Sequence, residues 1–362
     1  KISGVWIMAY TTIDDPSAFF QTKLYAGTGS TLSLTNDGNS NLQPDWVWIK
    51  NRDSTNWHIL QDSSRGSGKS LFSNDTYQET SDSSTRNIQF DSNGITLSGS
   101  TSSFNDINDS SDDFVAWQWK CNGGTTSSNS NGDITSTVQT NSTAGFSIGT
   151  YTGDGDNTHS VGHGLGATPA WIIVKRREGT HSWIVWHQNL TATTAYAIDL
   201  ENTDAEANNT SYFHDTAPDA NTFHPGNGGA TNGSGGTYVF YAFKDIQGYS
   251  KFGSYTGNGN TDGVFVYTGF KPAWALIRAT DSDEWRIYDN KRANPFNVIN
   301  VRLKAHSNAA ESQDDNECDF LSNGIKFRSN SGGVNTTDQK YIYMTFAEHP
   351  FVSSKGVPVT AR

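Results

Sequence analysis

The sequence has very little cysteine, no long apolar run and no excess of basic residues. Its two cysteines, Cys121 and Cys318, lie far apart in a chain of 362 residues. Two free thiols are therefore the simplest expectation, with a single long-range disulfide as the alternative, and the chain is not a disulfide scaffold. No stretch approaches the roughly 18 consecutive apolar residues of a membrane span. The formal net charge is −12 and the basic residues are scattered, which argues against nucleic-acid binding because phosphates require a positive surface.

Two further patterns are missing. The first residues, KISGVWI before Met8, contain no basic stretch followed by an apolar run and a cleavage site, so no signal peptide is expected. Helical periodicity of useful length is also absent. The chain instead has many small polar residues, 35 glycines, 11 tryptophans and 14 tyrosines. Small polar residues form turns and large aromatic side chains build cores, so short strands joined by many turns are expected.

The clearest pattern is a stretch that occurs three times. The copies are PDWVWIKNRDSTNWHILQD from Pro44, PAWIIVKRREGTHSWIVWH from Pro169 and PAWALIRATDSDEWRIYDN from Pro272. Each copy follows a Tyr-small-Gly-x-Gly stretch (YAGTG, YTGDG, YTGNG) and precedes an aromatic run (FVAWQWK, YVFYAFK, YIYMTFA). Corresponding landmarks lie about 125 residues apart between the first and second copies and about 103 apart between the second and third. Three units of similar structure are therefore expected.

Within each unit the apolar period is two rather than 3.6. Both faces of Trp46–Ile49 and of Trp171–Val174 are apolar, which is typical of a strand covered on both sides. NRDSTN, RREGTH and ATDSDE are expected to form hairpin turns, and DSNGITL from Asp91 and LSNGIKF from Leu321 supply Asn-Gly turns. The predicted fold class is all-β, with three tandem β-sandwich (jelly-roll-like) repeats of roughly 100 residues each.

The landmarks also divide the chain into segments. The segment between the first two units is rich in Ser, Asn, Thr and Gly and cannot bury a core, so it is expected to be flexible or draped over a neighbouring unit. The predicted segments are an N-terminal extension or anchor (1–23), repeat 1 (24–120), the linker (121–144), repeat 2 (145–246), repeat 3 (247–351) and a C-terminal tail (352–362).

Tryptophans recur at two positions in every unit. Because all three units share them, these side chains are expected to lie in the cores. They are Trp46, Trp57, Trp171, Trp183, Trp274 and Trp285. Trp186 and Tyr288 are predicted to lie on the opposite face of the second strand, where the first unit has Leu60. They are therefore the candidates for an exposed surface that binds a ligand.

One short motif is similar to that of an enzyme. GFSIG, from Gly145 to Gly149, matches the G-x-S-x-G of serine hydrolases, in which the serine lies on a sharp turn from a strand to a helix. Ser147 instead enters an expected strand and no helix follows, so it is not assigned as a nucleophile. The acidic residues offer no pair that sequence alone identifies as a glycosidase pair. No catalytic residue and no cofactor are predicted.

Metal-binding patterns are equally sparse. The nine histidines form no H-E-x-x-H motif, and AEHPF from Ala347 has no partner. The stretches GDGDNT, DSDE and SQDDNECD offer carboxylate oxygens of the kind that bind calcium, with Asp154 and Asp156 as candidates. None has the EF-hand spacing. Solvated turns are the simpler interpretation, and no metal site is assigned.

A resemblance to known proteins covers nearly the whole chain, from Met8 to about Phe351. The segments that carry it are MAYTTIDDPSAFFQTKLY, QPDWVWIKNRD, FVAWQWKCNGG, GFSIGTYTGDG, VGHGLGATPAWIIVKRR and the stretch from YSKFGSYTGNG to DGVFVYTGFKPAW. In combination they resemble a repeat family of virion structural, tail-fibre-like proteins of tailed bacteriophages, especially marine phages and cyanophages. The resemblance implies an extracellular particle protein and carries over no catalytic residue.

The function expected from these observations is that of a non-enzymatic virion structural protein on the particle surface. It would be a tail fibre, an appendage or a capsid-surface decoration protein that presents β domains outward. Its expected partners are itself, as a homotrimer by analogy with fibres, and other virion proteins. Its outer loops either contact a host-surface glycan or only keep the particle soluble. No nucleic-acid or membrane partner is expected.

Other functions remain open at this point. The main alternative is a carbohydrate-binding cell-surface or filament protein of a bacterium. A polysaccharide-degrading spike is less favoured, because units of this length do not form the repeats of a β-helix.

Overall fold

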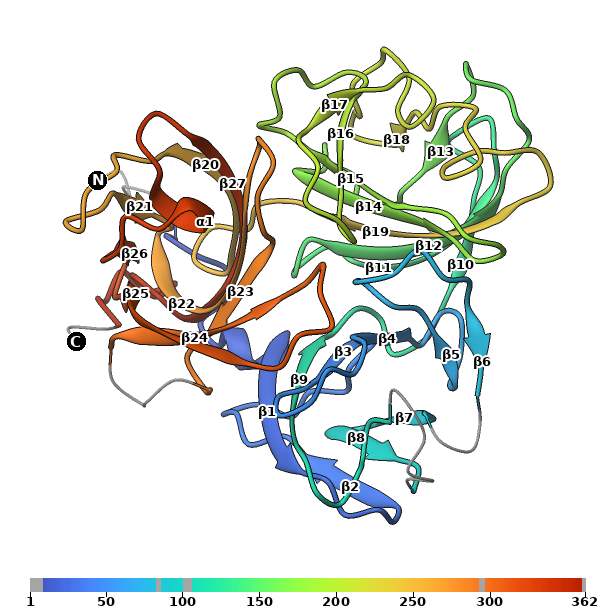
Figure 1. Ribbon diagram of the computed structural model, residues 1–362. Helices are drawn as coiled ribbons and strands as arrows, with labels where there is room; N and C mark the ends of the chain where they lie inside the picture. The colour runs from blue at the N-terminus through green and yellow to red at the C-terminus, as the bar shows by residue number, and fades with distance from the viewer. Residues whose placement is uncertain (1–8, 83–85, 100–105, 293–296, 360–362) are drawn as a thin grey trace, which may run out of the picture.

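The chain folds almost entirely into β-strands, which confirms the all-β class. A computed structural model describes residues 9–82, 86–99, 106–292 and 297–359 (Figure 1). Among these residues, helix is confined to the 3₁₀ turn η1 (Pro16–Ala18) and the short helix α1 (Gly332–Asn335). No helix in the described part of the chain is long and apolar enough to cross a membrane.

Three antiparallel sheets repeat one strand order. In each sheet, the opening strand lies at one edge and pairs with the closing aromatic strand. The closing strand also pairs with the first tryptophan strand, and that strand pairs with the strand after the hairpin turn. We call the units lobes 1, 2 and 3. The strands, in that order, are β1 (Phe20–Ala26), β9 (Asp113–Trp119), β3 (Trp46–Asn51) and β4 (Ile59–Asp62) in lobe 1; β12 (Phe146–Thr152), β19 (Thr237–Phe243), β14 (Trp171–Arg176) and β15 (Trp183–His187) in lobe 2; and β20 (Ser250–Thr256), β27 (Lys340–Pro350), β22 (Phe270–Ala279) and β23 (Arg286–Asp289) in lobe 3.

The remaining strands of each lobe lie over the outer face of its main sheet or extend it. Lobe 1 adds β2 (Leu32–Thr35), β5 (Lys69–Ser70), β6 (Thr80–Ser81), β7 (Ile88–Asp91) and β8 (Gly94–Leu97); lobe 2 adds β13 (Val161–Gly162), β16 (Tyr196–Asp199), β17 (Ala207–Asn208) and β18 (Thr222–Phe223); lobe 3 adds β21 (Phe265–Tyr267), β24 (Ile299–Lys304), β25 (Ser312–Leu321) and β26 (Gly324–Phe327). Each lobe thereby encloses an apolar core of its own. The hairpin turns and the two Asn-Gly turns, which join β7 to β8 and β25 to β26, are confirmed.

The inner faces of the three main sheets share one further core, which we call the hub. Along β3, Trp46 and Trp48 belong to the hub, whereas Val47 and Ile49 belong to the core of lobe 1. Both faces of this strand are therefore buried, as its sequence predicts. The hub contains side chains from all three lobes, and Figure 1 shows the lobes arranged around a common centre. The two-faced apolar strands are thus covered within one chain.

The lobes contact one another in a closed ring. At each junction, a glutamate backbone N–H of one lobe donates to a backbone carbonyl of the next. The three bonds are Glu79 N to Arg177 O (2.8 Å), Glu206 N to Thr280 O (2.7 Å) and Glu311 N to Arg52 O (2.7 Å). Lobe 1 therefore contacts lobe 2, lobe 2 contacts lobe 3, and lobe 3 contacts lobe 1.

The segment predicted as a linker is structured. It contains β10 (Ser127–Asn129) and β11 (Ser136–Asn141), and β11 pairs with β12 along six residues. Of the two predicted alternatives, a flexible segment is wrong for these strands, whereas the pairing of β11 with β12 agrees with a segment that lies on a neighbouring unit. A strand added at a sheet edge is held mainly by backbone hydrogen bonds, so it needs little apolar content of its own. In addition, β1 begins at Phe20, inside the segment predicted as an N-terminal extension.

Candidate functional site

Five of the six recurrent tryptophans lie in the hub, as predicted, and Trp57 does not. Trp46, Trp171, Trp183, Trp274 and Trp285 are fully buried there. In lobe 2, Trp183 pairs with Lys175. In lobe 1, Lys50 is the equivalent of Lys175, and because Ile49 pairs with Ile59, the residue opposite Lys50 is His58 rather than Trp57. Trp57 is half-buried on the outer side against Phe72 and Tyr77. One residue of offset in the turn exchanges the faces of a strand.

His58 takes over the structural role of the missing indole. Trp48 Nε1 donates to His58 Nδ1 (2.8 Å), so Nε2 carries the proton and donates to Lys304 O of lobe 3 (3.0 Å). Burial holds the pKa of His58 well below its usual value, which keeps the ring neutral. The equivalent bonds are Trp183 Nε1 to Phe72 O (2.7 Å) and Trp285 Nε1 to Asp199 O (2.8 Å). These ring nitrogens join each lobe to its neighbour.

The prediction that Trp186 and Tyr288 form an exposed ligand surface is wrong. Trp186 is 2% exposed and Tyr288 is fully buried. Trp186 Nε1 donates to Thr193 O (3.2 Å), and the Tyr288 hydroxyl donates to the buried Glu317 carboxylate. The outer strands of lobes 2 and 3 cover these positions, and the repeat pattern contains no signal for that cover.

Asp154 and Asp156, the calcium candidates, lie in an exposed turn beside His159. The Asp154 carboxylate contacts His159 Nδ1 (2.6 Å) and accepts from Asp156 N (2.9 Å) and Asn232 Nδ2 (3.1 Å). Asp156 accepts from Thr158 N (2.9 Å). Within the described ranges, no group of three or more His, Cys, Asp or Glu side chains is placed to hold a metal ion. The turn's own donors engage these carboxylates.

Ser147 and the two cysteines are buried inside the fold. Ser147 is the second residue of β12 and does not lie on a turn, and its Oγ is 3.3 Å from Thr140 Oγ1. Cys121 and Cys318 are free thiols, as expected, and burial raises the pKa of both well above the usual value. None of the three has the exposure or the activating partner of a nucleophile.

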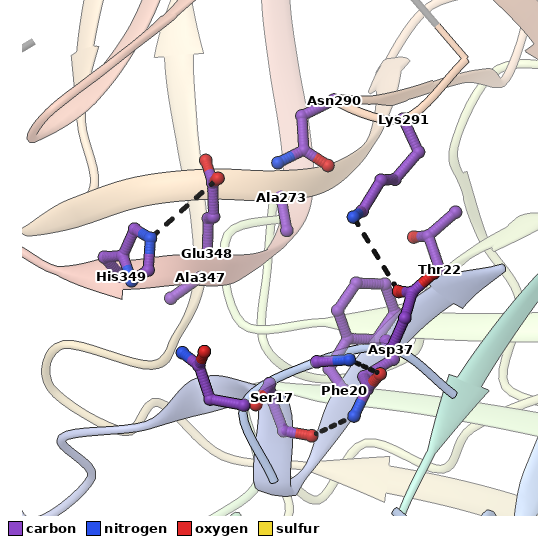
Figure 2. A pocket seen from close by; sticks show the side chains of 13 residues that line it. Ser17, Phe20, Thr22, Asp37, Ala273, Asn290, Lys291, Ala347, Glu348 and His349 are labelled. Carbon is purple, nitrogen blue, oxygen red and sulfur yellow. Dashed lines mark hydrogen bonds and ion pairs between the residues drawn. The ribbon is translucent and has the colours of Figure 1, made fainter. Parts of the chain in front are cut away.

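A recess with mixed polar and apolar lining lies where lobe 3 meets lobe 1, and it is the candidate functional site (Figure 2). Its volume is about 220 Å³. We call it the junction recess. Lobe 1 contributes η1, β1 and the loop after β2, and lobe 3 contributes β22, the loop after β23 and the end of β27. The lining residues are Ser17, Phe20, Gln21, Thr22, Asp37, Gly38, Asn39, Ala273, Asn290, Lys291, Ala347, Glu348 and His349.

The aromatic and amide side chains of β1 shape the recess. Phe20 is almost fully buried and stacks on Phe346 with ring centroids 5.4 Å apart, so its ring is fixed by the hub. Gln21 holds the loop after β2, because its Nε2 donates to Ser17 O (2.8 Å) and Ser40 O (2.9 Å) while its Oε1 accepts from Gly38 N (2.8 Å). The position of Asp37 and Asn39 is therefore set by β1.

The charges of the recess are compensated within the protein. Asp37 contacts Lys23 Nζ (3.0 Å) and Lys291 Nζ (4.0 Å), the latter across the junction, as Figure 2 shows. Partial burial raises the pKa of Asp37. The hydrogen bond from Lys23 and the charges of Lys23 and Lys291 together lower this pKa by more than burial raises it, so the pKa lies below its usual value. Glu348 contacts Lys271 Nζ (2.7 Å) and His349 Nε2 (3.9 Å). The recess therefore presents polar groups without a dominant sign of charge.

Sequence reasoning missed this site. Of the lining residues, the sequence offers only His349 of AEHPF as a possible metal ligand, and it has no partner motif. The lining comes from six separate segments of lobes 1 and 3, and only the closure of the ring brings them together. One difference between the repeats could have indicated the recess. At one position of the opening strand the first unit has the small polar Thr22, whereas the other two units have Ile148 and Phe252.

The fold and the recess define a class: an all-β protein of three lobes around one core, with a recess at one junction. The chain belongs to the family described as Domain of unknown function (DUF7483), which matches residues 15–350. This match spans all three lobes, so the family unit is the ring rather than a single repeat. No curated protein and no solved structure matches the chain.

Proposed function

We propose that the protein is a non-enzymatic structural component of a bacteriophage particle: a tail fibre, an appendage or a capsid-surface decoration protein. The observation that carries the proposal is the hub, which joins three loop-bearing lobes into one body. A body of this kind holds its outer loops in fixed relative positions, as surface presentation requires. The resemblance of the repeats to virion structural proteins supports the same function.

Buried side chains of the types that enzymes use in catalysis have structural partners here, which supports a non-enzymatic role. Ser147 is buried within a strand. His58 joins lobe 1 to lobe 3 through Lys304. Glu317 is buried between Arg286 (2.9 Å) and Arg302 (2.5 Å). Each of these groups is engaged by neighbours that hold the fold together.

Mass spectrometry of density-purified particles tests the proposal most directly. Particles produced from the genome that encodes this chain should contain the protein at a fixed ratio to the major capsid protein, and antibody-gold labelling should place it on the particle surface. Recovery of the protein only from the host cell envelope would contradict the proposal. That result would favour the alternative, a carbohydrate-binding cell-surface or filament protein of a bacterium.

Self-assembly into a homotrimer is part of the proposal. The apolar faces of the strands do not require a partner chain, because the chain covers them itself. What supports the trimer is the analogy with fibres. Light scattering on the purified protein should give three times the chain mass, and a monodisperse monomer at micromolar concentration would contradict this prediction.

A further inference from the structure

We propose that the junction recess binds a neutral saccharide and takes one monosaccharide unit, such as the end of a glycan chain. The inference goes beyond the particle role, because it concerns what the recess recognises wherever the protein is located. It is carried by a comparison of the three lobe junctions, by the buried hydroxyl of Thr22, and by the charge and size of the recess.

The three junctions are equivalent in register but differ in filling. Thr22, Ile148 and Phe252 occupy the same position of the opening strand in lobes 1, 2 and 3. Their partners on the closing strands are Trp117, Tyr241 and Met344, in that order. Ile148 and Phe252 are buried in the hub, where they supply apolar bulk. Lobe 1 has the smaller Thr22 at this position. The junction between lobes 3 and 1 therefore lacks bulk that the other two junctions have.

Glutamine side chains occupy the other two junctions. Between lobes 1 and 2, Gln139 of β11 reaches Ser63 and Ser64, which correspond in sequence position to Asn290 and Lys291 of the recess. Its Nε2 donates to both serine hydroxyls (3.0 and 2.9 Å), and its Oε1 accepts from Asn122 N and Gly124 N (2.8 Å each). This position of the fold therefore accommodates a neutral polar group that both donates and accepts.

Between lobes 2 and 3, Gln188 corresponds to Asn290 and donates through Nε2 to Phe252 O (2.6 Å). Asn290 is one methylene shorter. Lobe 1 also has no described counterpart of β11 beside β1. The junction recess remains open because both kinds of filling are missing there.

The buried hydroxyl of Thr22 is evidence that the recess binds a ligand. The residue is only 6% exposed, and its Oγ1 is buried without a hydrogen-bond partner among the described residues. An unsatisfied buried hydroxyl destabilises a protein. A ligand hydroxyl in the recess would satisfy it. The apolar side chains of Phe20, Ala273 and Ala347 lie around the same space and suit the C–H face of a sugar ring.

The charge and size of the recess select the ligand class. Asp37 and Glu348 are each compensated by a lysine of the protein, so neither a free anion nor a free cation finds an unpaired counter-charge. Amides, hydroxyls and compensated charges offer donors and acceptors side by side, which matches sugar hydroxyls because each donates and accepts. The volume of about 220 Å³ exceeds the roughly 150 Å³ of a cavity that holds benzene. One six-membered ring with its hydroxyls fits, and a longer oligosaccharide does not fit entirely.

The test is saturation-transfer NMR on the purified full chain with a panel of neutral monosaccharides: glucose, galactose, mannose and their N-acetylamino forms. At least one should bind with a dissociation constant of about 1 mM. Inorganic phosphate and glucosamine serve as the charged probes. Failure of every neutral sugar at about 20 mM, or preferential binding of a charged probe, would overturn the proposal.

Substitutions at one position locate the binding. Thr22→Ile places the side chain of lobe 2 in the recess and should weaken sugar binding by about tenfold or more, and the near-isosteric Thr22→Val should weaken it severalfold. Because Thr22→Val removes an unsatisfied hydroxyl, its melting temperature should be unchanged or higher, so it serves if Thr22→Ile fails to fold. Thr96→Val, on β8 of the same lobe, is the control and should bind as the wild type does. Equal binding by all variants would place the sugar elsewhere and overturn the site.

These measurements use isolated protein and do not depend on where the protein is found. Absence from the particle would contradict the proposed function and leave the recess assignment intact. Loss of the sugar site would leave the particle role intact.

Discussion

Buried cations show how single residues are held at the lobe junctions. Lys50, Lys175 and Arg278 occupy one register position and are all fully buried. Lys50 Nζ donates to the carbonyls of Asn51 (2.6 Å) and Ser54 (3.0 Å). Lys175 Nζ donates across the junction to Thr76 O (2.9 Å) and lies 5.8 Å from the centre of the Trp183 ring. Backbone carbonyls and ring faces therefore solvate these cations in place of water.

This burial predicts a pH dependence of stability. Desolvation lowers the pKa of Lys50 to about 7, against attraction from Asp112, Asp53 and Glu311, and lowers that of Lys175 to about 8. The unfolded chain keeps both protons up to about pH 10. Above pH 7 the folded state therefore binds fewer protons than the unfolded state, and the free energy of unfolding rises with pH.

Urea unfolding at pH 7, 8 and 9 measures this effect. The free energy of unfolding should rise by up to about 1.4 kcal/mol per pH unit for each lysine. Lys50→Met should reduce the slope, because it removes one proton from the difference between the two states. Lys251, whose side chain is 40% exposed beside Asp245, serves as the control, and Lys251→Met should keep the wild-type slope. A flat profile in the wild type would mean that both lysines remain charged in the fold.

The offset of Trp57 predicts unequal costs for two tryptophans that the sequence places in one column. Trp183→Ala removes a fully buried hub side chain together with its bond to Phe72 O, and should destabilise the protein by about 3–5 kcal/mol. Trp57→Ala removes a half-buried side chain and should cost about 1–2 kcal/mol. Chemical denaturation compares the two variants. Equal costs would place Trp57 in the core after all.

At the scale of elements, two junctions contain a buried ion pair at one equivalent position and the third contains a neutral set of side chains there. Asp62 bonds Arg65 (2.5 Å) and accepts from Tyr241 of the next lobe (2.7 Å). Asp289 likewise bonds Arg292 (2.6 Å) and accepts from Trp117 Nε1 (3.0 Å). Between lobes 2 and 3 the corresponding residues are His187, Leu190 and Met344. Burial lowers the pKa of His187 to about 3, so this set is neutral. The same backbone arrangement thus holds an ion-paired set at two junctions and a neutral set at the third, and the three residues of a set differ together.

This comparison predicts the outcome of exchanging one junction for another. Arg65→Leu alone leaves the buried Asp62 carboxylate without its counter-charge and should cost about 3–5 kcal/mol. The triple variant Asp62→His, Arg65→Leu, Tyr241→Met copies the neutral set of the junction between lobes 2 and 3 and should recover more than half of that loss. Urea unfolding of the single, double and triple variants measures the coupling. A triple variant as unstable as the sum of its single changes would show that the junctions are not equivalent.

The strands and turns could be predicted from the sequence, whereas the pairing between lobes could not. Alternation and Asn-Gly turns act locally, so β7, β8, β25 and β26 follow from a few neighbouring residues. Asp62 and Tyr241 are separated by 179 residues, and nothing near either one indicates the other. The outer strands over Trp186 and Tyr288 were missed for the same reason. The structured β11 was missed because its composition resembles that of a linker.

At the scale of the whole molecule, the three repeats are parts of one body rather than beads on a chain. Each main sheet has a second apolar face, and all three faces meet in the hub, where Trp171 of lobe 2 lies edge-on to Trp285 of lobe 3 with centroids 5.9 Å apart. The sequence predicts three units, and it also predicts strand faces that need cover. It does not predict that the units cover one another, because a partner chain would satisfy the same pattern.

The shared hub predicts that the lobes do not fold independently. Residues 121–246, lobe 2 with its added hairpin, keep the outer core that contains Trp186 and Phe240. Expressed alone, this fragment would expose the hub face of β14 and β15, including Trp171 and Trp183, and a large apolar surface without cover favours aggregation or unfolding. The fragment should therefore lack the near-ultraviolet circular dichroism of packed aromatic side chains.

The full chain should melt in one calorimetric transition, with a calorimetric enthalpy close to the van't Hoff value, because destabilising one lobe removes hub contacts from the other two. The variant Trp183→Ala extends the test, because removal of this indole should lower the temperature of the single transition without splitting the calorimetric peak. Three separate transitions, or a fragment 121–246 that unfolds cooperatively on its own, would show that each lobe is a domain and that the hub is an interface between finished folds. In this ring the hub is a core to which all three lobes contribute, so we expect the smallest unit that can fold to be the three-lobed chain that the family match spans.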